Sequence, residues 1–298
     1  MKNIKTFSIL ALTILIITLG SAQVLSHSLR STSKVLLASE LLWSPLNPAR
    51  GDASPQAATI WGDRNGTEAT GYLVKFKQGF SSPPHIHNVT YRGVVIDGLV
   101  HNDDPKAKNM WMPKGSFWTQ PAGEAHITSA EEKSNIAYIE IDEGPYLVQP
   151  QEEAFDNGER PVNVDASNIV WLNAANLHSG DREAPRLRRD RSRESNSLSK
   201  PQVAFLWGNP QDEKPYGSMI KLPTGFKGEI RNYGSDFHAV VIEGQPEYLA
   251  LRGKETKTLE PGSYFSSSGK AEHKVFCQAR EECILYVRAE GQFDVVPI

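Results

Sequence analysis

The chain has 298 residues, of which 22% are charged, and a formal net charge of −3. This composition is typical of a globular protein, and the chain is long enough to bury two ordinary hydrophobic cores. The small excess of acidic residues gives no basic face for DNA or RNA, so we expect no nucleic acid among the partners.

The first 22 residues have the features of a secretory signal peptide. Lys2 and Lys5 precede an uncharged apolar run at 7–19, and this run ends at the small residues 20–22. An uncleaved membrane anchor is the alternative, but the run is shorter than the roughly 20 apolar residues that span a bilayer. We interpret 1–22 as a signal peptide, which predicts a secreted or periplasmic protein with no stable membrane span after cleavage.

The remaining chain is predicted to be all-β. Short apolar segments are separated by Gly, Pro, Asn and Asp, and helical periodicity is nearly absent. The strands predicted in the first half cover residues 59–61, 72–76, 89–96, 116–120, 126–128 and 136–141. Domains of this kind form sandwiches or barrels, and we expect an N-terminal domain at 35–160 and a C-terminal domain at 161–298.

Three histidines in the first half have the spacing of a metal site. His85 and His87 are two residues apart, so on a strand their side chains point to the same face. His126 follows 39 residues after His87 and, from a neighbouring strand, could complete the set. We predict one divalent metal, with iron or zinc as first candidates and manganese, nickel and copper open, because imidazole suits several of these ions. A packing role for the three histidines is the alternative.

The sequence contains an internal repeat. Residues 55–62 (PQAATIWG) recur as 201–208 (PQVAFLWG), an offset of 146, and residues 94–98 (VVIDG) recur as 240–244 (VVIEG). After a slip of one residue, His126 aligns with His273. A repeat of this length is too long for a solenoid unit and indicates two copies of a whole domain.

The second copy does not keep the three histidines. Arg231 and Tyr233 replace His85 and His87, and only His273 remains. His238 is one residue out of the ligand register, so we expect a structural role on the opposite face of its strand. Arg231 with His273 could hold a carboxylate in a second pocket, but we favour a degenerate copy kept for packing or dimer formation.

Residues 181–200 have no counterpart in the first copy. The segment is rich in arginine and serine with mixed charge, which predicts a mobile insertion. A basic docking segment is the alternative, although the acidic residues dilute its charge.

Cys277 and Cys283 are the chain's two cysteines. They flank five residues between the apolar runs 274–276 and 284–287, a pattern that predicts a hairpin whose ends face each other. In an oxidising compartment a structural disulfide is favoured, with two reduced thiols or a redox role as the alternatives.

Two stretches of the first copy resemble the motifs of the cupin superfamily. Gly79-Phe-Ser-Ser-Pro-Pro-His85-Ile-His87, with the VVIDG segment that follows, resembles the first cupin motif, and Gly115-Ser-Phe-Trp-Thr-Gln-Pro-Ala-Gly-Glu-Ala-His126 resembles the second. The second copy preserves this frame, so the chain is similar to a bicupin, nearest to ChrR-like cupins and their uncharacterised secreted relatives. The resemblance implies two tandem double-stranded β-helix, or jelly-roll, domains. It does not identify a reaction, because cupins include dioxygenases, isomerases, lyases, storage proteins and sensors.

The chain departs from the cupin pattern at one ligand position. The usual glutamate, seven residues before Gly98, is here Tyr91, and a phenol with a free pKa of about 10 is a poor ligand near neutral pH. The remaining three-histidine set resembles that of ferrous dioxygenases that cleave carbon–carbon bonds or oxidise thiols. A neutral ligand shell would leave the metal its full charge and open positions for water, oxygen or an anionic substrate.

Further residues of the first copy are candidates for the site. Tyr91 could donate to a bound oxygen or substrate, and Glu124 could act as an acid or base, although solvation of its turn is the alternative. His101 is expected to face outward as a non-ligand. The aromatic residues that could line the pocket, or simply the core, are Trp111, Phe117 and Trp118.

These observations predict a metal-dependent enzyme, an oxygenase first and a lyase or hydrolase next, that acts on a small carbonyl- or carboxylate-bearing substrate. A metal-containing binding or sensor protein without catalysis is the alternative, and a metal-free structural module is a third interpretation. Cupin domains often pair through their outer strands, so a homodimer is expected by analogy.

Overall fold

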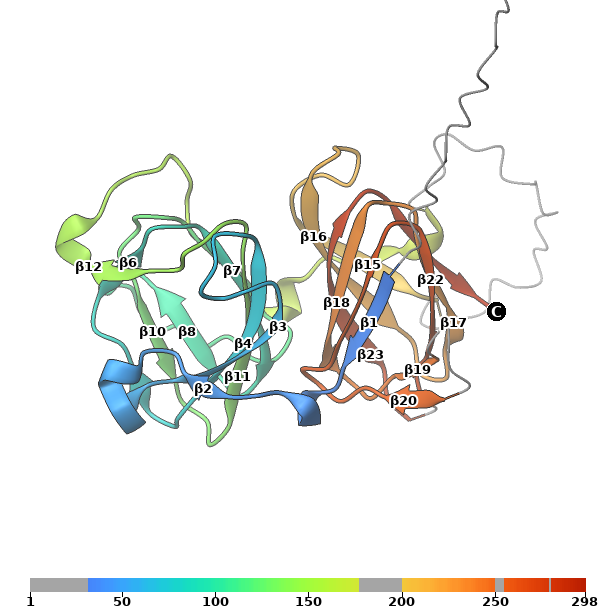
Figure 1. The fold of residues 1–298 in the computed structure, drawn as a ribbon, viewed down its shortest axis with the longest axis horizontal. Helices are drawn as coiled ribbons and strands as arrows, with labels where there is room; N and C mark the ends of the chain where they lie inside the picture. Colours follow the sequence, from blue (N-terminus) through green and yellow to red (C-terminus); the bar gives the residue numbers. More distant parts are fainter. Residues whose placement is uncertain (1–31, 177–199, 250–254, 279) are drawn as a thin grey trace, which may run out of the picture. The chain divides into compact units, whose positions relative to one another are not determined.

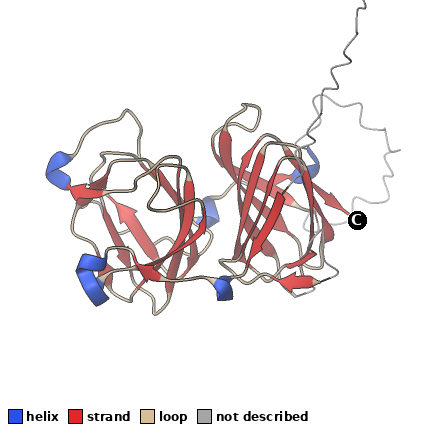
Figure 2. Ribbon diagram, in the orientation of Figure 1, coloured by secondary structure: helices blue, strands red, loops and turns tan. Residues whose placement is uncertain are grey.

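The computed structural model describes residues 32–176, 200–249, 255–278 and 280–298. Within these ranges the protein is almost entirely β, and the helical elements are the short 3₁₀ turns η1 (Ala38–Glu40), η2 (Pro48–Ala53), η3 (Gln151–Glu153), η4 (Ala166–Asn168) and η5 (Ala174–Asn176) (Figure 2). The all-β prediction is confirmed. In the described part of the chain, no helix has the length and apolar character needed to span a membrane. The predicted signal peptide at 1–22 lies outside the described residues, as does the predicted insertion at 181–200 except for its last residue.

The first half of the protein consists of one large sheet facing smaller ones (Figure 1). The large sheet has the order β13-β9-β7-β11-β4-β3-β2, with β2 (Ser44–Pro45), β3 (Gln56–Trp61), β4 (Thr70–Phe76), β7 (Tyr91–Asp97), β9 (Phe117–Gln120), β11 (Asn135–Ile141) and β13 (Val162–Val164). The smaller sheets are β5-β10-β8 and β12-β6, with β5 (Phe80–Ser81), β6 (His85–His87), β8 (Val100–Asp103), β10 (Ile127–Ala130) and β12 (Val148–Pro150). A core cluster that includes Tyr72, Val95 and Trp118 fills the interior.

The second half repeats this strand order. Its large sheet is β1-β21-β18-β23-β16-β15-β14, with β1 (Thr32–Leu36), β14 (Leu172–Asn173), β15 (Gln202–Trp207), β16 (Pro215–Leu222), β18 (Asp236–Glu243), β21 (Tyr264–Ser268) and β23 (Cys283–Glu290). The facing sheet is β20-β19-β22-β17-β24, with β17 (Lys227–Asn232), β19 (Glu247–Leu249), β20 (Thr256–Thr258), β22 (Ala271–Phe276) and β24 (Phe293–Pro297). The repeated sequence therefore corresponds to a repeated fold.

One strand is exchanged in each direction between the halves. β1, at the start of the described chain, pairs with β21 in the large sheet of the second half. β13, which follows the first half in sequence, pairs with β9 in the large sheet of the first half. The chain therefore does not pass from the sheets of the first half to those of the second at residues 160/161. The division into domains at 35–160 and 161–298 stays a prediction.

The large sheets of the two halves share an apolar cluster made of equivalent residues. Leu73, Val94, Ile96, Phe117 and Tyr138 from the first half meet Met219, Val240, Ile242, Tyr264 and Tyr286, their counterparts in the repeat. At the centre, the Glu140 carboxylate accepts hydrogen bonds from the hydroxyls of Tyr138 (2.8 Å) and Tyr286 (2.7 Å). The counterpart of Glu140 in the repeat is Arg288, whose guanidinium lies 3.5 Å from the same carboxylate. The duplication has thus placed opposite charges at equivalent positions of one buried interface.

Cys277 and Cys283 form a disulfide, which agrees with the favoured interpretation of the sequence. The predicted hairpin is wrong. β22, before Cys277, pairs with β17 and β19, whereas β23, which begins at Cys283, pairs with β16 and β18. The two apolar runs belong to different sheets because the chain crosses from one sheet to the other between the cysteines.

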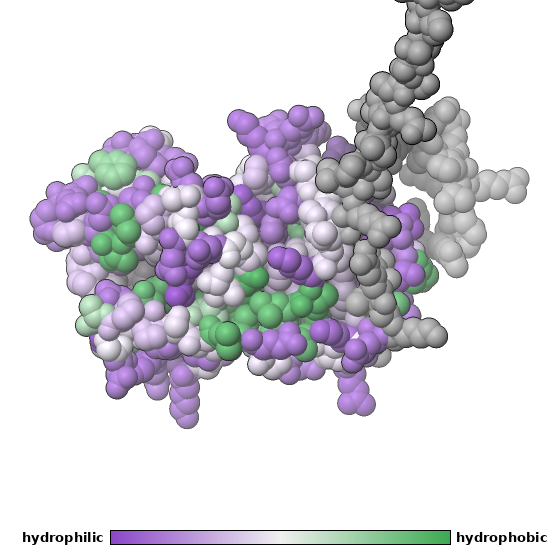
Figure 3. Space-filling view, viewed as in Figure 1, coloured by the Kyte–Doolittle hydropathy of each residue, from purple (hydrophilic) through white to green (hydrophobic). Residues whose placement is uncertain are grey.

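Most of the face shown in Figure 3 is hydrophilic, with smaller apolar areas. Exposed apolar side chains in the described residues include Leu42, Val170 and Phe205. Figure 3 also shows one contiguous apolar area across the lower middle of this face, but nothing in the structure shows what covers it. The homodimer stays a prediction.

Candidate metal centre

The three histidines come together on adjacent strands. His85 and His87 occupy alternate positions of β6, so their rings share the inner face of the strand. His126 precedes β10 and forms a β-bridge with His85, whose N–H donates to the His126 carbonyl at 3.1 Å. Each residue offers one ring nitrogen to a cluster in which these atoms lie within 4.8 Å of one another, and all three side chains are buried. The spacing predicted from the sequence is therefore realised in the fold.

Backbone carbonyls orient all three rings. The Nδ1 atom of His85 donates to Pro83 O (2.9 Å), that of His87 to Leu147 O (2.8 Å), and that of His126 to Glu124 O (3.1 Å). A carbonyl oxygen only accepts, so each Nδ1 carries the proton and each Nε2 keeps its lone pair. Such outer hydrogen bonds fix the tautomer and the direction of metal-binding imidazoles. The arrangement fits a divalent cation held by three Nε2 atoms.

The rings are neutral in this environment. Burial lowers the pKa of all three histidines, and the proximity of His85 helps to lower that of His126 to about 3. A neutral imidazole can bind a metal, whereas an imidazolium cannot, so the site is ready for a cation at neutral pH. The cluster contains no carboxylate, as the sequence predicted.

Two tyrosine hydroxyls lie beside the metal-facing nitrogens. The Tyr91 hydroxyl is 2.8 Å from Asn102 Oδ1 and 3.2 Å from His126 Nε2. Burial raises its pKa, so Tyr91 keeps its proton and can donate it in a hydrogen bond. Tyr146, which the sequence analysis did not select, donates to His87 Nε2 at 2.9 Å and stacks on the His87 ring at 4.1 Å. The only sequence signal for Tyr146 was its place at the end of the first repeat.

A closed polar network supports Tyr91 and His126 from behind. Asn102 Nδ2 donates to Gln120 Oε1 (2.9 Å), and Gln120 Nε2 donates to the Glu124 carbonyl (3.1 Å) that also holds His126. The Asn102 carbonyl oxygen accepts from both Tyr91 and Thr128. Because every member has a partner, the network can hold the His126 ring and the Tyr91 hydroxyl in one arrangement.

Glu124 reaches the site through its backbone. Its carbonyl orients His126, while its side chain is not among the residues that line the cavity beside the histidines. The carboxylate instead helps Asp156 to raise the pKa of Arg160. The acid–base role of Glu124 stays a prediction that the geometry of its side chain does not favour.

The other residues singled out in the first half have different positions. His101 is not part of the cluster, as predicted, but it is completely buried rather than turned outward, and its Nδ1 accepts a hydrogen bond from the Met110 N–H. Trp118 lines the cavity. Phe117 belongs to the apolar cluster shared by the two halves, and Trp111 packs against His101.

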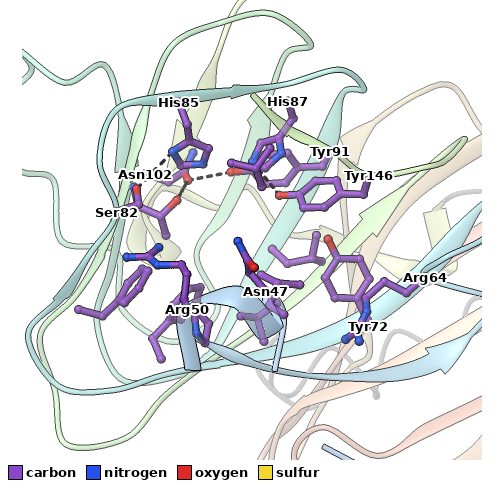
Figure 4. Close-up of a pocket in the computed structure, with 18 of the residues that line it drawn as sticks. Asn47, Arg50, Arg64, Tyr72, Ser82, His85, His87, Tyr91, Asn102 and Tyr146 are labelled. Atoms are coloured by element: carbon purple, nitrogen blue, oxygen red, sulfur yellow. Dashed lines mark hydrogen bonds between the residues drawn. The ribbon is translucent and has the colours of Figure 1, made fainter. Parts of the chain in front are cut away.

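A cavity of about 200 Å³ opens beside the cluster, and His85 and His87 are among the residues that line it. Figure 4 shows His85, His87, Tyr91 and Tyr146 along one side of it and Asn47, Arg50, Arg64 and Tyr72 across from them. Aromatic side chains make up much of the wall, and no aspartate or glutamate is among the described residues that line it. The site therefore combines a candidate metal position with a neutral to positive pocket.

A family model described as "Domain of unknown function (DUF4437)" matches residues 34–296. The chain belongs to this DUF4437 family. No curated protein matches the chain in sequence.

Solved structures resemble the DUF4437 chain over most of its length. A proposed dioxygenase from Nostoc punctiforme is 11% identical with a TM-score of 0.60, over 89% of this chain and 86% of that one. Salicylate 1,2-dioxygenase from Pseudaminobacter salicylatoxidans is 12% identical with a TM-score of 0.55, over 91% and 87%. An oxalate decarboxylase mutant from Bacillus subtilis is 13% identical with a TM-score of 0.50, over 89% and 79%. These likenesses support the cupin fold, while the ChrR-like subtype stays a prediction.

The second half of the DUF4437 protein has no equivalent cluster among its described residues. His273 is buried, with its ring nitrogens 2.9 Å from the Tyr248 hydroxyl and 3.0 Å from the Ser267 hydroxyl. Arg231 pairs with Glu229 at 2.8 Å, so the hypothesis that Arg231 and His273 together hold a carboxylate is not supported. His238 stacks on Trp61, away from His273, which agrees with its predicted structural role.

His273 should make the protein sensitive to mild acid. Burial lowers its pKa from 6.5 to about 4, so only the unfolded chain takes up this proton between those values. The contribution of the neutral His273 ring to the free energy of unfolding is fully present above pH 6.5 and is lost as the pH falls to 4. At 1.36 kcal/mol per pKa unit this contribution is about 3 kcal/mol. Urea unfolding of the wild type and His273→Gln from pH 7 to 4 measures this, with a shallower decline expected for the variant. Parallel declines would rule out His273 as a source of the acid sensitivity.

Proposed function

We propose that the protein is a secreted metal-dependent cupin enzyme, an oxygenase in the first instance, whose metal is held by His85, His87 and His126. The observation that carries this proposal is the fixed tautomer of the three rings, because each Nδ1 donates to a backbone carbonyl and each Nε2 keeps a lone pair, which a cation would take in place of the Tyr146 proton at His87. The two solved structures named as dioxygenases favour oxygenase chemistry over the lyase and hydrolase alternatives.

The residues around the site suit a small substrate. A divalent metal would act as a Lewis acid or, in the case of iron, support oxygen chemistry. Part of the cavity wall is apolar, and Trp118 and Ile139 belong to it. Tyr91 and Tyr146 keep their protons because burial raises the pKa of both, so their hydroxyls can orient a substrate oxygen. Lyase or hydrolase chemistry on a carbonyl- or carboxylate-bearing substrate would use the same groups.

The metal content of the native protein tests this proposal. The protein is purified without a histidine tag or chelator, bound metals are measured by mass spectrometry, and oxygen consumption is screened with small carbonyl and carboxylate compounds. We expect about one metal ion per chain. Iron with oxygen uptake supports the oxygenase, zinc moves the proposal to lyase or hydrolase chemistry, and metal without any turnover favours a binding or sensor protein. A protein that holds no metal and takes none up on reconstitution contradicts the proposal.

A further inference from the structure

At the cavity, the Tyr72 hydroxyl and the Arg64 Nη1 atom make no hydrogen bond of ordinary geometry within the described residues, and the Tyr72 hydroxyl has only a weaker interaction with Tyr146. Tyr72, on β4, is completely buried, and its hydroxyl makes no hydrogen bond of ordinary geometry. Arg64 donates from Nη2 to the Ser44 hydroxyl at 3.1 Å, while its buried Nη1 has no acceptor. Both side chains line the cavity. Buried polar groups are nearly always paired in native proteins, so two such donor atoms in one pocket indicate a ligand that accepts from them.

The charge at this end of the cavity is positive. Arg50 and Arg64 both line it, and neither forms an ion pair with a carboxylate in the described ranges. The guanidinium of Arg50 lies over the Phe80 ring, 5.9 Å from its centroid. Because these two arginines line the cavity and the described wall has no acidic residue, the pocket attracts an anion.

The pocket favours a flat ligand body. Aromatic rings from Tyr72, Phe76, Phe80, Trp118 and Tyr146 supply much of the wall. In Figure 4, the Tyr72 hydroxyl points toward Tyr146, with the histidines beyond it, and Arg64 lies beside the Tyr72 ring. A ligand in this cavity therefore meets cationic and hydroxyl donors at one end and the histidine cluster at the other.

We propose that the cavity binds a small, flat organic carboxylate, with its carboxylate group held by Arg64 and the Tyr72 hydroxyl and its opposite end facing His85 and His87. A guanidinium matches the planar carboxylate with two parallel donors, and the phenol supplies a third. The carboxylate position rests on Arg64 and Tyr72 alone, whereas contact of the other end with a metal rests on the proposed function.

The test compares a carboxylate with its neutral counterpart. The probes are 3,4-dihydroxybenzoate and 3,4-dihydroxybenzamide for metal-loaded protein, and benzoate and benzamide for metal-free protein, with dissociation constants from calorimetry. We expect each carboxylate to bind the wild type at least about ten-fold more tightly than its amide. Arg64→Gln should weaken carboxylate binding about 10–100-fold, the range for a hydrogen bond to a charged group, and leave amide binding within about two-fold.

Two further variants make the result decisive. Tyr72→Phe removes one oxygen that makes no hydrogen bond of ordinary geometry, so it should fold normally and weaken carboxylate binding about 3–10-fold. Arg160→Gln makes the same substitution at an exposed arginine outside the cavity and should have no effect. Equal affinity for acid and amide, equal losses of both in Arg64→Gln, or no binding of any probe overturns the carboxylate site. The benzoate and benzamide measurements use metal-free protein. If the protein binds no metal, the proposed function is overturned, but tighter binding of benzoate than of benzamide would still support the carboxylate site.

Discussion

The double variant His85→Ala, His87→Ala should lose the metal, falling from about one ion per chain to less than about a tenth. Loss of even an outer hydrogen-bonding partner typically costs 10–100-fold in metal affinity, so the loss of two ligands should cost more than about 100-fold. The wild type should also be stabilised by metal, by about 4 kcal/mol when free metal is about 1,000 times the dissociation constant. Chelator should remove that stabilisation from the wild type and change the variant little.

The matched control is His101→Asn, which replaces a buried histidine of the same half that lies outside the cluster. Metal content per folded chain and the free energy of unfolding with and without chelator are compared across the three proteins. The His101 variant can be less stable, but it should keep its metal. If the double variant retains metal, or if the control loses it equally, the three-histidine site is wrong.

Replacing Glu140 with alanine should destabilise the protein by about 3 kcal/mol, the lower end of the range for breaking a buried ion pair. The carboxylate is fully buried, and its loss leaves two tyrosine hydroxyls without their acceptor and Arg288 with one carboxylate partner fewer. Arg288 retains Asp142 at 2.7 Å, which is why we expect the lower end. Guanidinium unfolding at pH 7 measures the effect.

The exposed Glu143→Ala is the control and should change the free energy of unfolding by less than about 0.5 kcal/mol. A second comparison is the double variant Glu140→Leu, Arg288→Leu, which removes both charges. It should recover part of the loss, because a buried ion pair can be replaced by apolar residues more easily than it can be broken. If Glu140→Ala is as mild as Glu143→Ala, the contact between the two halves does not depend on this buried charge.

The histidine cluster could be predicted because its geometry is local. Side chains alternate along a strand, so His85 and His87 had to share a face once β6 formed. The degenerate second site was equally predictable, since the repeat places Arg231 and Tyr233 where the first copy has histidines. The hairpin at the cysteines was mispredicted for the opposite reason. Which sheet a strand joins depends on partners far along the chain, such as β16 and β17.

The all-β class, the duplication and the three candidate metal ligands could all be inferred from the amino-acid sequence, because each depends on patterns within a few residues or on a repeated pattern. The groups that surround those ligands, by contrast, depend on how distant parts of the chain fold together. Tyr146 lies 59 residues from its partner His87 in the sequence. Tyr72 reaches the cavity from β4, and Arg64 reaches it from the loop before β4. These contacts, like the exchange of β1 and β13, arise when distant strands pack around one core, and no local periodicity encodes them.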